Sequence, residues 1–244
     1  MLAIIGGSGL TQFTGLEVTH RQVVRTPYGE PSAPLSFGKL LGFPVVFLAR
    51  HGDGHTIAPH EVNYRANLWA LCEQAVENIV SVAAVGGIRT GIAPGAIVIP
   101  DQIIDYTWGR KCTFFDAGEP VQHIDFTEPY ARELRARILA AARACGEAVH
   151  EGAVYAAMQG PRLETAAEIN RIERDGADIV GMTGMPEASL ARELALPYAA
   201  IAVVANFAAG RADSREGISM AKIEAVLGEA MTRVCRIIET MVQI

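Results

Sequence analysis

The stretch from Gly152 to Met182 constrains the fold of this chain more than any other. Residues 152–157 (Gly-Ala-Val-Tyr-Ala-Ala) carry no charge and predict a buried strand. The pair Gly160-Pro161 ends that strand, and residues 165–175 predict a helix. Residues 177–182 predict a second buried strand. A strand, a helix and a strand in this order indicate an α/β fold.

The rest of the chain continues this alternation. Two segments joined by the turn Thr26-Pro27-Tyr28-Gly29 predict a pair of hairpin strands, and buried strands then alternate with amphipathic helices. The predicted hairpin strands are residues 18–24 and 34–40, the other strands are 2–5, 44–49, 79–85, 97–104 and 197–205, and the helices are 62–77, 128–144 and 220–241. A length of 244 residues without an internal repeat or linker predicts one α/β domain over residues 1–244.

Composition and charge exclude several classes of protein. Half of the residues are apolar, yet no apolar run approaches the length of a membrane span. Residues 1–7 lack the features of a signal peptide and predict the first strand instead. The net charge of −6 and the pI near 5.5 argue against nucleic acid as a partner. Four cysteines without a CxxC pair suit reduced thiols, so we expect a cytoplasmic protein with no membrane partner.

Polar side chains follow three of the predicted strands. Glu164 lies at the turn between a strand and a helix, Thr183 follows the strand 177–182, and Asn206 follows the strand 197–205. In open α/β sheets, ligands bind at the carboxyl ends of strands, so we expect these residues to face one crevice. The alternative makes Glu164 a carboxylate at a helix N-terminus and Asn206 a turn residue.

Two further strand ends carry possible anion-binding groups. The loop Gly6-Gly7-Ser8-Gly9 can form a nest of backbone N–H groups with the Ser8 hydroxyl as an added donor, although a plain tight turn fits as well. Arg50 and His51 follow a buried strand, where Arg offers a fork for phosphate and His adds a donor. A surface Arg beside a capping His is the equally weighted alternative.

The remaining histidines and aromatic residues suggest other roles. His51, His55 and His60 invite a metal hypothesis, but glycines separate the first two and no Glu adjoins His55, so we expect hydrogen bonding and no metal. The segment 108–127 has no periodicity and is rich in aromatic residues. Such a segment typically covers a site or a subunit interface.

Several motifs in sequence order indicate a family. They are Ile5-Gly6-Gly7-Ser8-Gly9-Leu10, Leu48-Ala49-Arg50-His51-Gly52, Val62-Asn63-Tyr64-Arg65-Ala66-Asn67, Gln159-Gly160-Pro161-Arg162 and Met182-Thr183-Gly184-Met185-Pro186-Glu187. Over its whole length the chain resembles the trimeric purine nucleoside phosphorylase and methylthioadenosine phosphorylase family. The resemblance implies an enzyme of purine salvage, in which phosphate attacks the anomeric carbon of a purine nucleoside and releases base and ribose 1-phosphate. It implies a three-layer α/β domain with a mixed central sheet, a homotrimer or a dimer of trimers, and inorganic phosphate as co-substrate without a cofactor.

The resemblance also implies roles for single residues. Phosphate would be held by Ser8, Arg50, His51, Thr183 and the backbone N–H of Ala84. Met182 would lie under the ribose, and His123, in the motif Val121-Gln122-His123-Ile124, would reach into a neighbouring subunit's sugar pocket. Ala83 and Leu163 depart from the family, which has a phosphate-binding Thr and a purine-stacking Phe there. Phe207 is our candidate for the missing stacking partner.

Two further departures indicate the substrate. Methylthioadenosine phosphorylases have Ser and Asp at the positions of Glu164 and Asn206, whereas this chain resembles inosine- and guanosine-cleaving enzymes at both. Asn206 can donate to O6 and accept from N7, and Glu164 can accept the N1 hydrogen of a 6-oxopurine. The inosine- and guanosine-cleaving enzymes have a His that donates to the 5′-hydroxyl. This chain has Met220 at that position, and Ile223 lies one helical turn later.

Met220 and Ile223 suit a methylthio group, although each could merely pack the helix on the sheet. Glu164 and Asn206, which suit a 6-oxopurine, together with an apolar 5′ pocket predict 5′-methylthioinosine as substrate. Within the enzyme class, the alternatives are methylthioadenosine phosphorylase and inosine/guanosine phosphorylase. A non-catalytic nucleoside sensor is the alternative from another class, and the retained phosphate residues argue against it.

Overall fold

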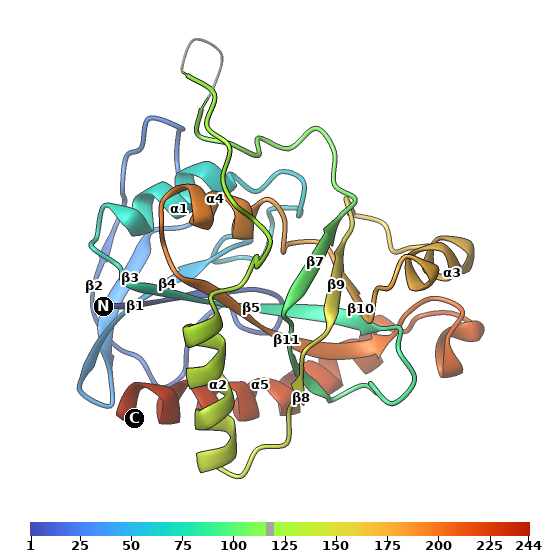
Figure 1. The fold of residues 1–244 in the computed structure, drawn as a ribbon. Coiled ribbons are helices and arrows are strands. Elements are labelled where there is room, and N and C mark those ends of the chain that lie inside the picture. The colour runs from blue at the N-terminus through green and yellow to red at the C-terminus, as the bar shows by residue number, and fades with distance from the viewer. Residues whose placement is uncertain (116–119) are drawn as a thin grey trace.

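The chain is built on one large mixed sheet. The computed structural model describes residues 1–115 and 120–244 (Figure 1). Eleven strands are found in these residues: β1 (Leu2–Gly6), β2 (Glu17–Gln22), β3 (Leu35–Leu40), β4 (Phe43–Ala49), β5 (Asn78–Gly87), β6 (Ile97–Ile99), β7 (Gln102–Asp105), β8 (His150–Glu151), β9 (Val154–Ala157), β10 (Ile179–Gly181) and β11 (Tyr198–Phe207). The α/β fold with a mixed sheet, predicted from the sequence, is confirmed.

Helices cover both faces of this sheet. In Figure 1, α1 (Tyr64–Cys72) and α4 (Glu187–Glu193) lie above it and α2 (Arg132–Ala144) and α5 (Met220–Gln243) lie below it. The helix α3 (Ala166–Arg174) packs near the β9–β10 end, and a short 3₁₀ turn, η1, spans Ala212–Arg215. Within the described residues, no helix has both the length and the apolar character needed to cross a membrane.

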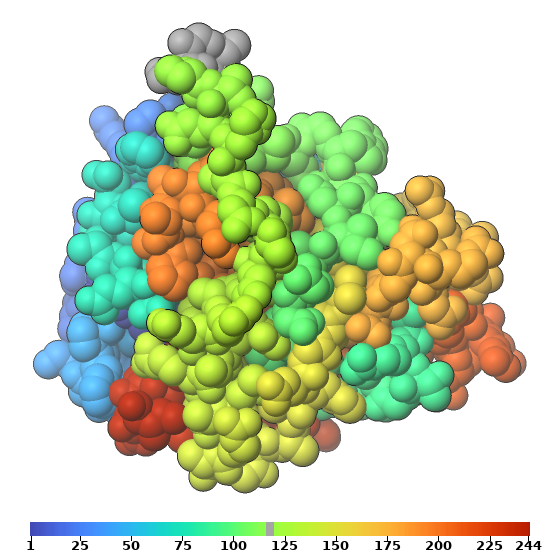
Figure 2. Space-filling view, viewed as in Figure 1, coloured from blue at the N-terminus to red at the C-terminus, as the bar shows by residue number. Residues whose placement is uncertain are grey.

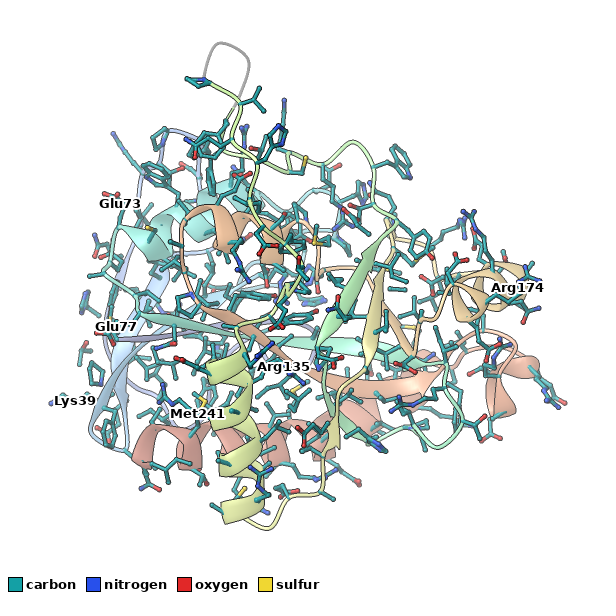
Figure 3. The ribbon with its side chains drawn as sticks, in the orientation of Figure 1. Lys39, Glu73, Glu77, Arg135, Arg174 and Met241 are labelled. Carbon is teal, nitrogen blue, oxygen red and sulfur yellow. The ribbon has the colours of Figure 1, made fainter. Side chains whose placement is uncertain are left out.

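The centre of the sheet holds the core. β5 and β11 pair in parallel along nearly their whole lengths and are buried almost throughout. Burial on both faces explains why both read as continuous apolar runs. At the other extreme, every residue of the edge strand β2 is exposed. Arg135 of α2 points inward and donates to the carbonyl oxygen of Pro100 at 2.8 Å, whereas Lys39, Glu73 and Arg174 lie at the periphery (Figure 3).

A reversal of strand direction places the site. β1 runs parallel to β4 and β5, whereas β10 runs antiparallel to β5, with Ile179 opposite Gly87 and Val180 opposite Gly86. The carboxyl end of β10 therefore arrives partway along β5, beside Ala84. Loops from β1, β4, β9, β10 and β11 converge there, which is the kind of switch point where α/β sheets bind ligands.

Some boundaries differ from the prediction. The predicted strand 97–104 is wrong: β6 and β7 are separate strands, and β6 pairs with β11 and β8 while β7 pairs with β9. Pro100 lacks an N–H for the ladder, and the Asp101 carboxylate instead accepts from the backbone N–H of Ala153 at 3.0 Å. The predicted helix 62–77 is shorter, because Asn63 caps its start and Ala75 has a positive φ of 53°.

Other elements agree with the prediction or were missed. The hairpin of β2 and β3 and the turn at Thr26–Gly29 are confirmed. α3 begins as predicted, because Thr165 and Glu168 form a reciprocal capping box. The helix α4 and the short strand β8 have no counterpart in the prediction. Part of the aromatic segment 108–127 lies outside the described residues, and the chain from 120 onward runs across the surface over α4 (Figure 2).

Candidate active site

A cavity of about 750 Å³ opens where the strand ends meet. Eleven of the thirteen residues predicted for the site line it: Ser8, Arg50, His51, Ala84, Leu163, Glu164, Met182, Thr183, Asn206, Met220 and Ile223. Phe207 and His123 do not. The cavity is large enough for a nucleoside and an anion together, since ligand sites commonly enclose about 300–1,000 Å³.

Arg50 lies at the floor of the cavity in a buried network. Its side chain is fully buried, so the surface-Arg alternative is wrong. The guanidinium donates to both carboxylate oxygens of Glu187, at 2.6 Å from Nε and 2.8 Å from Nη2. It also donates to Ser81 Oγ at 2.6 Å and to the Val82 carbonyl oxygen at 3.0 Å. Glu187 is itself fully buried and accepts from Ser81 and Tyr198, each at 2.8 Å.

This network leaves Arg50 one free donor toward the cavity. Four of its five N–H groups have partners, and the fifth, on Nη1, has none among the described residues. Nη1 lies against Gly7, where a Cβ would come within 2.8 Å of it. Gly7 thus leaves space for the guanidinium. Burial alone disfavours the charged form, but the charge and hydrogen bonds of Glu187 outweigh it and raise the pKa of Arg50.

His51 enters the site as a neutral acceptor. Its Nδ1 lies 2.8 Å from the Ile57 carbonyl oxygen, and because a carbonyl only accepts, Nδ1 carries the hydrogen. Burial, together with the nearby charge of Arg50, lowers the pKa of His51 to about 4. Nε2 is therefore unprotonated at neutral pH. The prediction that His51 adds a donor to the site is corrected: it offers a lone pair, which suits a protonated phosphate oxygen.

Ser8 and His55 form a second polar pair at the same end. Ser8 Oγ lies 3.3 Å from His55 Nε2, and the rings of His55 and His51 lie 4.7 Å apart. His55 has a φ of +51°, a conformation that residues other than glycine seldom adopt. Burial lowers its pKa. The hydrogen-bonding role predicted for this histidine is present, and it lies in the site.

Thr183 is a further polar residue of the cavity. It is 8% exposed, lies beside the strand β5, and lines the cavity next to Ala84. Its backbone N–H points to the hydroxyl of Tyr155 at 3.4 Å. The Thr183 side chain also hydrogen-bonds with Tyr155. Ala83 adds no hydroxyl to the same wall, so the donors of this end are fewer than the family pattern provides.

Glu164 and Asn206 line the same cavity. The register of β11 against β5 shifts between Val204 and Asn206, and such a bulge re-aims the residue that follows. Asn206 Nδ2 donates to the carbonyl oxygen of Phe207 at 2.6 Å, which orients the amide. Burial raises the pKa of Glu164, and the neighbouring charge of Glu168 adds to the rise.

Phe207 does not stack in the cavity. Successive residues of a strand point to opposite faces, so Phe207 is directed away from the face where Asn206 lies. The expectation that Phe207 replaces the missing family Phe is therefore corrected. Leu163, which is 42% exposed and lines the cavity, is the apolar group at that position.

The remaining end of the cavity is apolar and open. Met220 and Ile223 of α5 line it with Ile218 and Leu227. Met220 is 61% exposed, so one face of this end has no cover within the described part of the chain. Glu224 stands at its rim. His123 is exposed and lies outside the cavity of its own chain, so its predicted place in a neighbour's site stays a prediction.

The structure adds residues that the sequence analysis did not assign. Glu187 is part of a motif quoted above but was given no role. The sequence feature that could have indicated it is Arg50 after a buried strand, because a buried Arg requires a buried acid as partner. Thr11, Ile218, Glu224 and Gly228 also line the cavity, and no distinctive sequence pattern marks them. In the described ranges 1–115 and 120–244, no cluster of His, Cys, Asp or Glu side chains could hold a metal ion.

The fold and the cavity define an α/β protein with a ligand site where strand direction reverses in its sheet, and comparison with known proteins identifies its family. The chain belongs to the phosphorylase superfamily, whose model matches residues 1–243. It is 54% identical over 233 residues to a probable S-methyl-5'-thioinosine phosphorylase of Pseudomonas syringae pv. tomato, covering 95% of this chain and 94% of that protein. A 6-oxopurine nucleoside phosphorylase of Pyrococcus furiosus is 48% identical over 215 residues, covering 86% and 80%.

Solved structures agree with the fold. Methylthioadenosine phosphorylase from Schistosoma mansoni in complex with adenine superposes with a TM-score of 0.95 at 32% identity, covering 99% of this chain and 90% of that one. The family resemblance inferred from the motifs is confirmed.

Proposed function

We propose that this enzyme cleaves S-methyl-5′-thioinosine with phosphate to hypoxanthine and 5-methylthioribose 1-phosphate. The observation that carries the proposal is the pairing of Glu164 and Asn206 with the apolar wall of Met220 and Ile223 in one cavity. The Pseudomonas syringae relative is named for this reaction, which supports the choice of substrate. Glu164 and Asn206 differ from the pair found in methylthioadenosine phosphorylases, whereas Met220 differs from the His found in inosine-cleaving enzymes.

The phosphate end supplies the nucleophile. Ser8, His51 and Thr183 hold the phosphate, with the remaining N–H of Arg50 and the backbone of Ala84 beneath it. His51 Nε2 accepts the hydrogen of a P–OH group, which turns the ionised oxygens toward the sugar. The anion placed below C1′ stabilises the cationic sugar that forms as the glycosidic bond breaks, while Met182 packs against the ribose.

The base end stabilises the leaving group. Negative charge gathers on the purine as the glycosidic bond lengthens, and it is relieved when N7 gains a proton from solvent water. The sugar phosphate formed from HPO₄²⁻ returns one proton to solvent from its P–OH group. The Asn206 carbonyl accepts the N7 hydrogen and its amide donates to O6, while the Glu164 carboxylate accepts the N1 hydrogen. Adenine offers a bare lone pair at N1, and such a mismatch of buried polar groups can cost a factor of about 10⁴ in selectivity.

The open 5′ end supports an oligomer. Met220 is exposed in the single chain, whereas a methylthio group gains binding energy only when its pocket is closed. We infer a homotrimer with cyclic symmetry, in which His123 of one subunit covers the 5′ end of the neighbouring subunit's cavity. Purine salvage in the cytoplasm is the setting of the reaction. Light scattering should give a trimer or a multiple of it, and an active monomer would contradict the assembly.

A direct comparison of substrates tests the function. Methylthioinosine, methylthioadenosine and inosine are supplied at equal concentration, with and without phosphate, and free base is measured. We expect phosphate-dependent release that is fastest from methylthioinosine. Faster cleavage of methylthioadenosine would overturn the reasoning about the base, and faster cleavage of inosine would overturn the reasoning about the 5′ end. Binding of methylthioinosine without any release of base would favour the nucleoside sensor.

A further inference from the structure

Arg110 makes more hydrogen bonds than any other side chain near the site, although it does not line the cavity. It follows β7 and is half-buried. Its Nε and Nη2 donate to the Gln159 side-chain and main-chain oxygens at 3.2 and 2.8 Å, and Nη2 also donates to the Met158 carbonyl oxygen at 3.2 Å. Its Nη1 donates to the carbonyl oxygens of Met182 and Met185, at 2.8 and 2.6 Å.

These acceptors belong to the two loops that carry Glu164 and Thr183, which line the same cavity. Met158 and Gln159 follow β9 and begin the loop that leads to Glu164. Met182 and Met185 follow β10 and flank Thr183. One guanidinium therefore ties the loop of the base end to the loop of the phosphate end.

The chemistry of the acceptors explains why an arginine is needed. In the part of the chain that the structure describes, Arg110 has no acidic partner, and four of its acceptors are backbone carbonyl oxygens. Carbonyl groups on two sides require donors that diverge in a plane, which a guanidinium provides and an ammonium does not. The Tyr64 hydroxyl accepts from Nη1 at 3.3 Å, and the Tyr64 ring lies 5.6 Å from the guanidinium carbon.

The loops also touch one another tightly. A Cβ at Gly160 would come within 2.5 Å of the Met182 sulfur, so the two loops have little room to move apart or together independently. Met182 is also the residue that lies under the ribose. A displacement of either loop would therefore move groups at both ends of the nucleoside.

We propose that Arg110 is a positioning residue that sets the distance between the base-reading loop and the phosphate-holding loop. The inference rests on the proposed function, since it assigns both ends of the cavity to one reaction. This role differs from that of the residues that contact the substrate. Thr183→Ala should alter mainly the KM for phosphate and Glu164→Gln mainly the choice of base, whereas Arg110→Ala should alter both at once.

The test compares Arg110→Ala with Lys111→Ala, a change of the exposed neighbouring residue. Arg110→Ala should lower kcat/KM for methylthioinosine by about 10²-fold, because a loop shift of about 1 Å can cost that much. It should also raise the KM for phosphate and narrow the preference for methylthioinosine over methylthioadenosine. Free guanidinium, at concentrations too low to unfold the protein, should restore all three quantities together. Ammonium should not, and Lys111→Ala should match the wild type.

Several outcomes would overturn the proposal. If folded Arg110→Ala retained wild-type kinetics, or changed only one end of the site, the loops would not depend on this residue. If Arg110→Ala did not fold, Arg110→Lys would replace it, and full activity with lysine would refute the need for a planar fork. Calorimetric binding of phosphate and hypoxanthine to each variant gives a readout that does not require turnover. If the wild type bound both but cleaved no nucleoside, the proposed function would fail, whereas the loss of both affinities in Arg110→Ala would still support the positioning role.

Discussion

Replacing Glu187 by Gln tests the buried network under the phosphate site. Both Arg50 and Glu187 are fully buried, and the carboxylate accepts four hydrogen bonds, from Arg50 twice, Ser81 and Tyr198. Gln keeps the shape, removes the charge and places an NH₂ group among donors. Arg50 then remains as a buried charge without its counter-ion.

The expected loss of stability follows from this geometry. Removing one partner of a buried ion pair costs about 3–5 kcal/mol, because the other charge is left in a medium that solvates it poorly. For a chain of this length each kcal/mol lowers the midpoint of thermal unfolding by about 2–4 °C, so Glu187→Gln should lower Tm by about 6–20 °C. Calorimetry or circular dichroism at neutral pH measures the change.

Two controls make this prediction specific. Glu173→Gln removes the acid from an ion pair with Arg211 in which Glu173 is 49% exposed, and it should cost at most about 1 kcal/mol. The double change Arg50→Met with Glu187→Leu removes both buried charges and should recover much of the stability that Glu187→Gln loses. If Glu187→Gln cost no more than Glu173→Gln, the buried pair would not contribute as argued.

Two further predictions concern substrate choice. Glu164→Ser with Asn206→Asp should move preference toward methylthioadenosine, and Met220→His should favour inosine without changing base preference. The effects should add, since the base and the 5′ substituent are opposite ends of the proposed substrate. Steady-state rates on the three nucleosides check this, and a change of base preference in Met220→His would contradict it. Because the pKa of Glu164 is raised, its carboxylate gains a proton at a higher pH than an ordinary glutamate does. As pH falls through that raised value, the ratio of methylthioinosine to methylthioadenosine cleavage should fall, and a ratio independent of pH in the acidic range would count against Glu164 as the reader of N1.

The sequence was sufficient to locate the ends of strands and much of the cavity. Glycine, proline and charged residues that follow apolar runs mark where a strand stops, and in this fold those points converge. Ser8, Arg50 and Thr183 were found in this way and lie together. The capping box at Thr165 was equally local, so the start of α3 was predicted within a residue.

Interactions between distant segments could not be predicted in the same way. The partner of Arg50 lies 137 residues away in sequence, and nothing local distinguishes Glu187 from a surface acid at a helix start. The bulge before Asn206, which sets the direction of the Asn206 side chain, depends on how β11 pairs with β5. Arg110 lies in a segment without periodicity, so only the folded positions of two loops reveal its role. The helix α4 has seven residues, too few for a clear periodic pattern.

The charge balance at the phosphate site has a consequence for the Glu187→Gln variant. In the wild type, Glu187 neutralises Arg50, and His51 is uncharged because burial and the charge of Arg50 lower its pKa to about 4. In the proposed reaction, phosphate is then held mainly by hydrogen bonds. Without Glu187 the charge of Arg50 is unpaired, and its Nη1 still lies beside Gly7 at the cavity.

A bound phosphate should therefore replace part of the missing counter-ion in this variant. A ligand that binds only the folded state stabilises it more when it binds more tightly, so adding phosphate should raise the Tm of Glu187→Gln more than that of the wild type. Thermal unfolding with increasing phosphate at constant ionic strength measures both increments. Equal increments would mean that the Arg50 guanidinium does not reach the bound anion, and Arg50 would then support the fold rather than the binding of phosphate.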